Sequence, residues 1–154
     1  MANRPPVDVR RLRDGDVTAF RDLLFLFGEA FGDMETYTAR QPSDSYLSDL
    51  LRDESVFVVT AFSLGRVIGG LVAYELKKFE QERSEIYIYD LAVTESERRH
   101  GVATQLIEHL KAVSKLRSAY VVFVQADYGD DAAIALYDKL GVQERVLHYD
   151  IAVD

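Results

Sequence analysis

The segment with the clearest chemical potential is residues 90–104, where an apolar strand runs into a polar turn and then a helix. The strand ends at Val93, and the helix opens around Gly101. Backbone N–H groups at such a turn point outward and, with the positive end of the helix dipole, bind anions such as a diphosphate. Glycine allows close approach, and Arg98 and Arg99 add charge for further phosphates. The segment matches neither G-x-G-x-x-G nor G-x-x-x-x-G-K-[ST], which disfavours a dinucleotide or nucleoside triphosphate ligand.

Asp90 is a candidate catalytic residue because it lies inside an apolar strand beside this turn. A carboxylate there costs free energy unless it is paired or used, so it is either a satisfied structural group or a site residue. Asp127, Asp130 and Asp131 follow a later apolar strand and are candidates for substrate binding, with Asp127 the better one. Asp130 suits a helix N-cap equally well. Two adjacent acids without a histidine do not predict a metal site.

Tyr137 lies three residues from both Ile134 and Leu140, so it faces the core side of its predicted helix. A buried tyrosine with a hydrogen-bonded hydroxyl is the ordinary structural interpretation. Glu85 and Tyr87, near the start of an aromatic and β-branched strand, are secondary candidates for the site. The histidines have no partner at catalytic spacing and receive no role: His100, His109 and His148.

The composition excludes several classes of protein. The 154 residues suit one domain, and the absence of cysteine rules out disulfide frameworks, thiolate metal sites and cysteine nucleophiles. The net charge of −8 disfavours nucleic acid as a partner. Residues 125–154 hold seven acids against two bases, either as a solvated face or as a surface for a polycation. No apolar run reaches the roughly 20 residues of a membrane span, and the first residues lack a signal peptide's apolar stretch, so we expect a cytoplasmic protein without a membrane partner.

Hydrophobic periodicity predicts strands and helices along the whole chain. Strands are expected over residues 7–13, 56–62, 67–76, 86–93, 120–124 and 142–153, with 120–124 covered on both faces. Helices are expected after a cap at Asp14 or Asp16, after Ser43, over 101–115 and over 132–140, with 32–44 as a loop and Gly141 as a C-terminal cap. No repeat or linker interrupts this order, so residues 1–154 are expected to form one α/β domain with a mixed sheet.

Residues 98–103 read Arg-Arg-His-Gly-Val-Ala and match the acetyl-CoA signature [QR]-x-x-G-x-[GA]. With the order of the expected elements, the chain resembles the GCN5-related N-acetyltransferase (GNAT) superfamily over essentially its whole length. Longer segments resemble the gentamicin (aminoglycoside) 3-N-acetyltransferases: residues 27–33, 79–93, 120–124, 125–131 and 135–141. The resemblance implies the GNAT fold, with a mixed, mostly antiparallel central sheet flanked by helices. It also implies acetyl transfer from acetyl-CoA, without a metal, to the 3-amino group of a 2-deoxystreptamine antibiotic, conferring resistance.

The resemblance also implies roles for individual residues. The coenzyme is expected to contact Leu91, Ala92, Val93, Arg98, Arg99, His100, Gly101, Val102, Ala103 and Thr104. In the family, a tyrosine at the place of Tyr137 protonates the departing thiolate. Some members carry a general-base glutamate near the place of Tyr87, and because tyrosine cannot easily replace it, the base is expected at Asp90. The acceptor is expected to contact Glu85, Tyr87, Asp127, Tyr128, Asp130 and Asp131.

The charge pattern agrees with a polycationic aminoglycoside as acceptor. Such a substrate needs carboxylates to hold its ammonium groups and one carboxylate to take a proton, and the acidic residues 125–154 supply them. The absence of cysteine fits direct attack by the amine on acetyl-CoA. Two alternatives share the coenzyme site: an acetyltransferase for another amine, such as a polyamine or a protein lysine, and an acyl-CoA-binding module without turnover. Members of the family often form dimers, which leaves a homodimer open.

Overall fold

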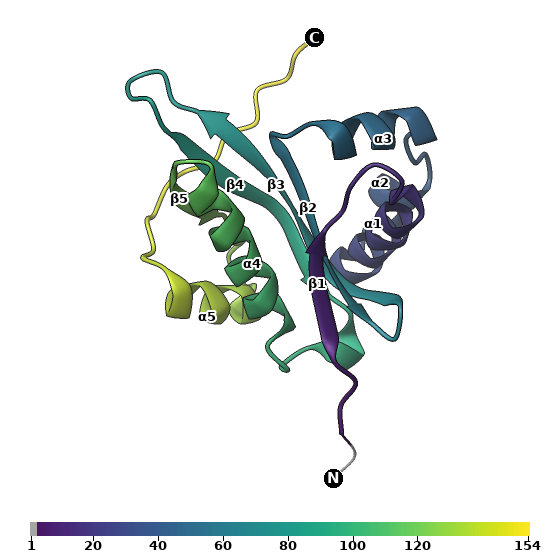
Figure 1. Ribbon diagram of the computed structural model, residues 1–154. Coiled ribbons are helices and arrows are strands. Elements are labelled where there is room, and N and C mark those ends of the chain that lie inside the picture. The colour runs from purple at the N-terminus through teal and green to yellow at the C-terminus, as the bar shows by residue number, and fades with distance from the viewer. Residues whose placement is uncertain (1–2) are drawn as a thin grey trace.

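A five-stranded mixed sheet forms the centre of the computed structural model, which describes residues 3–154 (Figure 1). The strands lie side by side in chain order. They are β1 (Val7–Arg11), β2 (Val56–Ser63), β3 (Arg66–Lys77), β4 (Ser84–Val93) and β5 (Ala119–Val124). The first four strands pair antiparallel, and β5 pairs parallel with β4. The predicted α/β class and the mixed, mostly antiparallel sheet are therefore confirmed.

Helices cover both faces of this sheet (Figure 1). One face carries α1 (Val17–Phe31), α2 (Met34–Thr38) and α3 (Asp44–Arg52), and the other carries α4 (Val102–Leu116) and α5 (Asp131–Leu140). Phe27 and Leu47 belong to the apolar layer of the first face, and Leu106 packs with Ile86 in the second. No helix in residues 3–154 is long and apolar enough to cross a membrane.

The helix starts confirm two of the three predicted caps. Ser43 caps α3, and Asp130 caps α5, each with a side-chain oxygen that accepts a backbone N–H. The third is confirmed only in position, because neither Asp14 nor Asp16 makes a side-chain cap hydrogen bond to α1. Asp16 occupies the N-cap position, but its carboxylate turns back to pair with Arg10 at 2.9 Å. Both carboxylate oxygens of Asp16 accept hydrogen bonds from Arg10 and therefore do not cap the helix.

Residues 32–44 contain the short helix α2 where the sequence predicts an uninterrupted loop. Five residues are too few to show an apolar periodicity. Gly32 has a φ of 64°, a left-handed conformation that lets the chain turn sharply out of α1. Asp33 then caps α2 by accepting a hydrogen bond from the Thr36 N–H at 3.1 Å. The correction matters for the site because α2 carries Tyr37.

Residues 142–153 do not form the predicted final strand. They run as an extended, exposed segment that pairs with no strand of the described chain. Gly141 ends α5 with a φ of −151°, so it is extended and not the left-handed cap expected there. Without a strand beside it, β5 is the edge of the sheet and is partly exposed, which corrects the expectation that it is covered on both faces. Both β5 and residues 142–153 are exposed because neither has a second strand to pair with in the described chain.

Candidate active site

The predicted coenzyme turn joins the end of β4 to the start of α4. A single turn of 3-10 helix, η1 (Glu95–Glu97), lies between them. Ala92 and Val93 are buried in the sheet, and Leu91 is partly buried against the α4 face. The Arg98 side chain folds back over the turn, where its Nε donates to the Val93 carbonyl at 2.9 Å. Arg98 therefore holds the strand end and the turn together.

The backbone of the turn presents a row of N–H groups. Within residues 3–154, no group accepts a hydrogen bond from the N–H groups of Arg99, His100, Gly101, Val102, Ala103 and Thr104. Arg99 and Gly101 adopt left-handed φ angles of 62° and 79°, so the row curves instead of continuing as a regular helix. Successive N–H groups in such a curve form an anion-binding concavity, and the N-terminus of α4 adds its dipole. The geometry fits a diphosphate.

A bulge in β4 decides which way Asp90 points. Ile88 pairs with Ala73 and Asp90 pairs with Val72, so Tyr89 is an extra residue without a cross-strand partner. Side chains alternate along a strand, so an unbroken β4 would place Asp90 on the α4 face with Ile88. The extra residue reverses that alternation. Asp90 therefore faces α1 and α2, on the opposite side of the sheet from α4.

Tyr37 fixes the Asp90 carboxylate. Its hydroxyl donates to Asp90 Oδ2 at 2.8 Å, and its ring packs edge-on against Phe27 and beside Phe31. Burial raises the pKa of the Asp90 carboxyl, and the hydrogen bond from Tyr37 opposes that rise. Burial and the nearby carboxylate also raise the pKa of Tyr37, so its hydroxyl keeps its proton and stays a donor. A half-buried carboxylate with raised basicity and a fixed direction suits a general base.

β4 and β5 pair only along the first half of β4. Pairing ends at Ile88 with Val124, and residues 89–93 have no partner on β5. Because the two strands are parallel, the loop after β5 lies at the same end of the sheet as Asp90. Tyr87 stacks on Phe123 with ring centroids 4.7 Å apart, and its hydroxyl donates to Gln125 Oε1 at 2.9 Å. Backbone groups of residues 89–93 on the β5 side are thus free of strand pairing beside Asp90.

Tyr137 lies on the other face of the sheet from Asp90. It packs against the apolar layer under α4, together with Leu136. Tyr137 is partly buried, and its hydroxyl forms no hydrogen bond with any group in residues 3–154. Burial raises the pKa of Tyr137, and the charge of Asp130 raises it further. The hydroxyl is therefore protonated at neutral pH and free to donate.

The acidic loop after β5 has one structural and several exposed members. The Asp130 carboxylate accepts the Ala133 N–H at 3.2 Å and so caps α5. Asp127, Tyr128 and Asp131 are exposed, and Tyr128 exposes 95% of its surface. These side chains stand at the end of the sheet where β4 and β5 separate. They can meet a ligand there without first breaking a contact within the protein.

Glu85 and part of the acidic segment 125–154 lie away from Asp90. Glu85 is five positions before Asp90 on β4, on the order of 15 Å along a strand, and pairs with Lys78 at 3.6 Å. Three of the seven acids of residues 125–154 lie in the extended segment 142–154. The predicted acceptor-binding acids at the Asp90 end of the sheet are therefore those of the loop after β5, and Glu85 is not among them.

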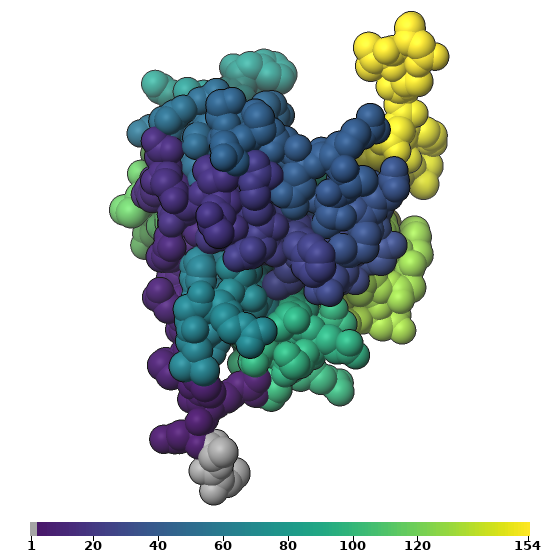
Figure 2. Space-filling view, turned by 90° about the vertical axis from the view of Figure 1, so that its right-hand side faces the viewer, coloured from purple at the N-terminus to yellow at the C-terminus, as the bar shows by residue number. Residues whose placement is uncertain are grey.

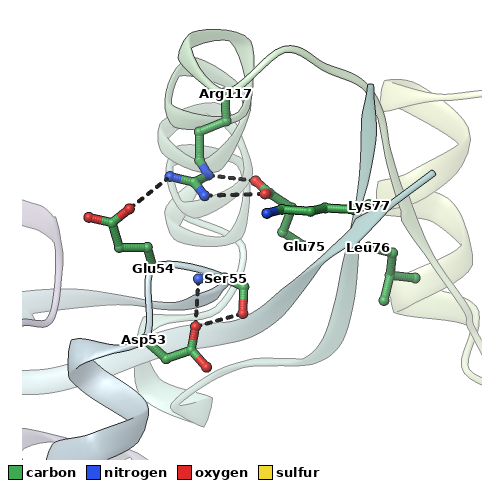
Figure 3. A pocket seen from close by; sticks show the side chains of 7 residues that line it. All are labelled: Asp53, Glu54, Ser55, Glu75, Leu76, Lys77 and Arg117. Carbon is green, nitrogen blue, oxygen red and sulfur yellow. Dashed lines mark hydrogen bonds and ion pairs between the residues drawn. The ribbon is translucent and has the colours of Figure 1, made fainter. Parts of the chain in front are cut away.

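The surface has two open pockets, one beside the turn after β4 and one away from the candidate site. A hollow of about 230 Å³ lies beside the turn, lined by Leu26, Glu29, Ala30, Thr94, Glu95 and Arg98. A larger one, about 590 Å³, opens at the C-terminal end of α4, and Figure 3 shows its lining: Asp53, Glu54, Ser55, Glu75, Leu76, Lys77 and Arg117. None of the predicted site residues lines the larger hollow.

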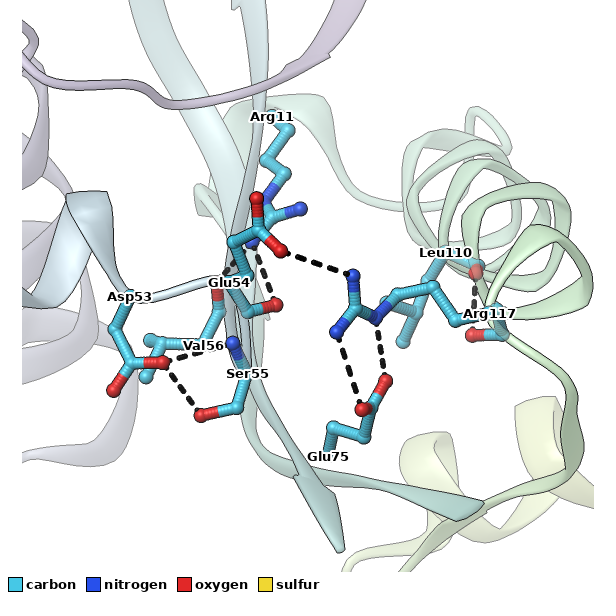
Figure 4. A network of polar contacts seen from close by, with 9 residues as sticks. Arg11, Asp53, Glu54, Ser55, Val56, Glu75, Leu110 and Arg117 are labelled. Carbon is cyan, nitrogen blue, oxygen red and sulfur yellow. Dashed lines mark hydrogen bonds and ion pairs between the residues drawn. The ribbon is translucent and has the colours of Figure 1, made fainter. Parts of the chain in front are cut away.

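The larger hollow is built around an ion-pair network. Arg117 binds the buried Glu75 carboxylate at 2.5 Å and approaches Glu54 at 3.9 Å. Figure 4 shows Arg11 in the same network, where it donates to the backbone carbonyls of Glu54 and Val56. These groups satisfy one another between β2, β3 and the end of α4. The network stabilises the fold at the end of α4 opposite the coenzyme turn.

Sequence reasoning missed Tyr37 and the role of Gln125. Tyr37 stands 53 residues before Asp90 in a predicted loop, and no local pattern connects the two. Gln125 directly follows β5, and its position after an apolar strand is a signal that a polar group meets the strand end. Tyr37 orients the Asp90 carboxylate, and Gln125 holds the Tyr87 ring. Both pairs lie near the point where β4 and β5 separate.

The chain is similar to known acetyltransferases. Residues 19–142 match the model of the acetyltransferase (GNAT) family. The crystal structure of an aminoglycoside acetyltransferase from an uncultured soil metagenomic sample is similar, with a TM-score of 0.95 and 54% sequence identity. The match covers 97% of this chain and 99% of that one. Because only about five residues of this chain stay unmatched, the similarity includes most of the extended residues 142–154.

Two further relatives are more distant. A second aminoglycoside acetyltransferase from a soil metagenomic sample, solved in complex with sisomicin, has a TM-score of 0.88 and 29% identity over 96% of this chain and 97% of its own. An N-alpha-acetyltransferase of Sulfurisphaera tokodaii is 31% identical over 102 residues, and the match spans 58% of this chain and 61% of that protein. Because the family model matches residues 19–142, the chain belongs to the acetyltransferase (GNAT) family, whose members use acetyl-CoA.

Proposed function

We propose that the protein is an aminoglycoside 3-N-acetyltransferase that moves the acetyl group of acetyl-CoA to the 3-amino group of 2-deoxystreptamine antibiotics such as gentamicin. The observation that carries the proposal is the half-buried Asp90, held by Tyr37 close to the anion-binding turn. Similarity to two soil aminoglycoside acetyltransferases, one solved with sisomicin, supports the acceptor class. The 3-amino position rests on the sequence resemblance. Acetylation removes a positive charge from the antibiotic, which gives a chemical basis for resistance.

The coenzyme is held by the backbone in this proposal. The N–H groups of residues 99–104 bind the diphosphate, and the α4 dipole strengthens that binding. Residues 89–93 of β4, unpaired on the β5 side, offer N–H and C=O groups to the amides of the pantetheine arm, much as a strand edge binds a peptide. This path leads the thioester to the place where β4 and β5 separate.

Asp90 and Tyr137 then act from opposite faces of the sheet. The Asp90 carboxylate accepts a proton from the acceptor amine, directly or through a water molecule, as the new N–C bond forms. Its raised pKa increases its basicity, and the Tyr37 hydrogen bond keeps it ionised and aimed. The Tyr137 hydroxyl gives its proton to the sulfur as the C–S bond breaks, and it recovers a proton from solvent. No covalent acyl-enzyme is needed.

The loop after β5 binds the acceptor. The exposed carboxylates of Asp127 and Asp131 attract ammonium groups, and Tyr128 can cover a sugar ring. Asp130 adds charge while it caps α5. Tyr87 holds the loop through Gln125 and so positions these groups beside Asp90.

A peptide amine is the second candidate acceptor, because the chain is 31% identical to an N-alpha-acetyltransferase over 102 residues. A thiol-release assay with acetyl-CoA and five acceptors separates the hypotheses: gentamicin, kanamycin, spermidine, a lysine peptide and a peptide with a free N-terminus. We expect the highest kcat/KM with gentamicin and an acetyl group on its 3-amino nitrogen by NMR. Preference for either peptide or for spermidine would overturn the proposal. Coenzyme binding without turnover on any acceptor would identify a binding module.

A further inference from the structure

Four aromatic side chains form a continuous patch on the sheet beside Asp90. Tyr74 of β3 pairs with Tyr87 of β4, and Tyr87 pairs with Phe123 of β5, so these residues lie side by side across three strands. Tyr89, the extra residue of the β4 bulge, joins them. Its ring centroid lies 6.1 Å from that of Tyr74 and 5.8 Å from that of Tyr87. Together the four residues make up the aromatic patch.

The aromatic patch lies on the face of the sheet opposite α4. Ile86 and Ile88 belong to the apolar layer under α4, so Tyr87 between them points to the other face. That face carries α1–α3, which lie at the front of Figure 2 in purple and blue. The apolar layer under these helices includes Val58 and Val72, and within residues 3–154 it contains no residue of the patch. The patch is therefore a part of this face that the helices leave open.

Asp90 borders the aromatic patch. Tyr89 precedes it directly in the chain. Val72 is the cross-strand partner of Asp90, and Tyr74 lies two residues farther along β3, a step of about 7 Å. Burial, the neighbouring Tyr89 and the charge of Asp90 together raise the pKa of Tyr74, so its hydroxyl stays protonated. A cationic group held on the patch is therefore within reach of the Asp90 carboxylate as well.

The rings of the patch are available to a ligand. Tyr89 exposes 62% of its surface and Tyr74 36%, and their hydroxyls form no hydrogen bond within residues 3–154. Elsewhere in the described chain, arginine guanidinium groups lie over the rings of Phe57, Phe62 and Tyr120. No lysine or arginine of residues 3–154 lies over a ring of the patch. These electron-rich ring faces can therefore bind a cation that the ligand brings.

The rings also provide surfaces at two orientations. Tyr87 and Phe123 are parallel, with an interplanar angle of 2°. Tyr89 is turned by 65° from Tyr87 and by 80° from Tyr74. A flat, saturated ring can therefore lay its C–H face on one side chain while a substituent at its rim meets the face of another. An aminosugar or aminocyclitol has this form, with C–H groups on its faces and ammonium groups at its rim.

We propose that Tyr74 and Tyr89 bind the acceptor, by holding one of its saturated, ammonium-bearing rings on the aromatic patch beside Asp90. The inference rests on the proposed function, which supplies the class of acceptor. The C–H face of the ring lies on one tyrosine, and an ammonium group lies over the ring face of the other. The Asp90 carboxylate stays free for the reacting amine. The patch thus adds an apolar and cation–π contribution to the attraction that the acidic loop after β5 supplies.

Calorimetry of the full-length chain with gentamicin, and separately with acetyl-CoA, tests the proposal. Tyr74→Ala and Tyr89→Ala should each raise the gentamicin Kd about tenfold, because each removes one aromatic surface, and should leave the acetyl-CoA Kd unchanged. Tyr89→Phe keeps the ring and should stay within about threefold of the parent gentamicin Kd. Phe79→Ala is the matched control. Phe79 exposes 99% of its surface in the β3–β4 connection, at the opposite end of β4 from Asp90, so its loss should change neither Kd.

The possible failures are distinguishable. Parental gentamicin affinity in both alanine variants, or an equal loss in Phe79→Ala, would overturn the role of the patch and leave the proposed function standing. An equal loss in Tyr89→Phe would assign the effect to the hydroxyl and contradict stacking on the ring. Loss of acetyl-CoA affinity in the alanine variants would place the coenzyme on the patch in place of the acceptor. A parent protein that binds no gentamicin would refute the proposed function, and this assignment with it.

Discussion

The Tyr37 hydroxyl donates a 2.8 Å hydrogen bond to Asp90 and so joins α2 to the bulged part of β4. Phe27 and Phe31 hold the Tyr37 ring, which leaves its hydroxyl little freedom. The bond stabilises the ionised form of Asp90 and limits the rise in its pKa that burial causes. The ionisation of Asp90 therefore depends on a residue 53 positions away in the sequence.

Tyr37→Phe should move the acidic limb of the pH profile to higher pH. The substitution keeps the ring and removes a donor to the carboxylate, so the pKa of Asp90 rises further and its basic form appears only at higher pH. A hydrogen bond to a charged group contributes about 1.5–3 kcal/mol, which corresponds to a shift of roughly one pH unit or more. The pH dependence of kcat/KM measures the shift. Tyr46→Phe, on the exposed side of α3, is the control, and an unchanged limb in Tyr37→Phe would contradict the role.

Gly101→Val should weaken acetyl-CoA binding at least about tenfold while the fold survives. A β-branched residue is strained at a φ of 79°, at a cost of about 1–3 kcal/mol, and its relaxation disturbs the row of N–H groups. Gly65→Val is a matched control, because Gly65 has a φ of 75° in the β2–β3 turn, away from the coenzyme turn. Calorimetry gives both affinities. Equal coenzyme affinity in the two variants would place the diphosphate elsewhere.

Asp127→Asn should raise the gentamicin KM about three- to tenfold and leave the acetyl-CoA KM unchanged. An exposed carboxylate that holds an ammonium group is screened by salt, so the acceptor KM of the parent enzyme should also rise with ionic strength. Asp138→Asn, an exposed acid farther along α5, controls for the loss of charge alone. Identical acceptor KM values for the two variants would make the loop a solvated surface.

Tyr137→Phe should lower kcat by about 10²–10³ and leave the melting temperature unchanged. The hydroxyl forms no hydrogen bond within residues 3–154, so its removal costs the fold little, while the packed ring remains. Steady-state kinetics and thermal unfolding of one purified variant give both values. Normal turnover would exclude Tyr137 as the acid.

Much of the site was predictable from local sequence. The turn from Val93 to Gly101 stood out because an apolar strand, a polar turn and a helix follow one another within a few residues. Asp90 stood out as a lone acid in an apolar strand. Its direction was not predictable, because the bulge at Tyr89 reverses the alternation of side chains and depends on the register with β3.

The other features that the sequence did not predict share one cause. Each depends on pairing with a part of the structure that lies far away in the sequence. Tyr37 was hidden because α2 is too short to show a period and its partner lies 53 residues away. The alternation in residues 142–153 predicted a strand, but a strand also needs an edge to pair with. The sequence pattern shows which face of the segment is apolar, and it does not show what that face packs against.

In the proposed mechanism Asp90, turned toward α1 and α2 by the bulge, takes the proton from the acceptor amine. The most direct measurement is kcat for gentamicin acetylation by Asp90→Asn, with Glu85→Gln on the same strand as control. We predict a fall in kcat of about 10²–10⁴ for Asp90→Asn, loss of the acidic limb of the pH profile, and near-normal kcat for Glu85→Gln. An Asp90→Asn enzyme with normal kcat and an unchanged pH profile would contradict the mechanism.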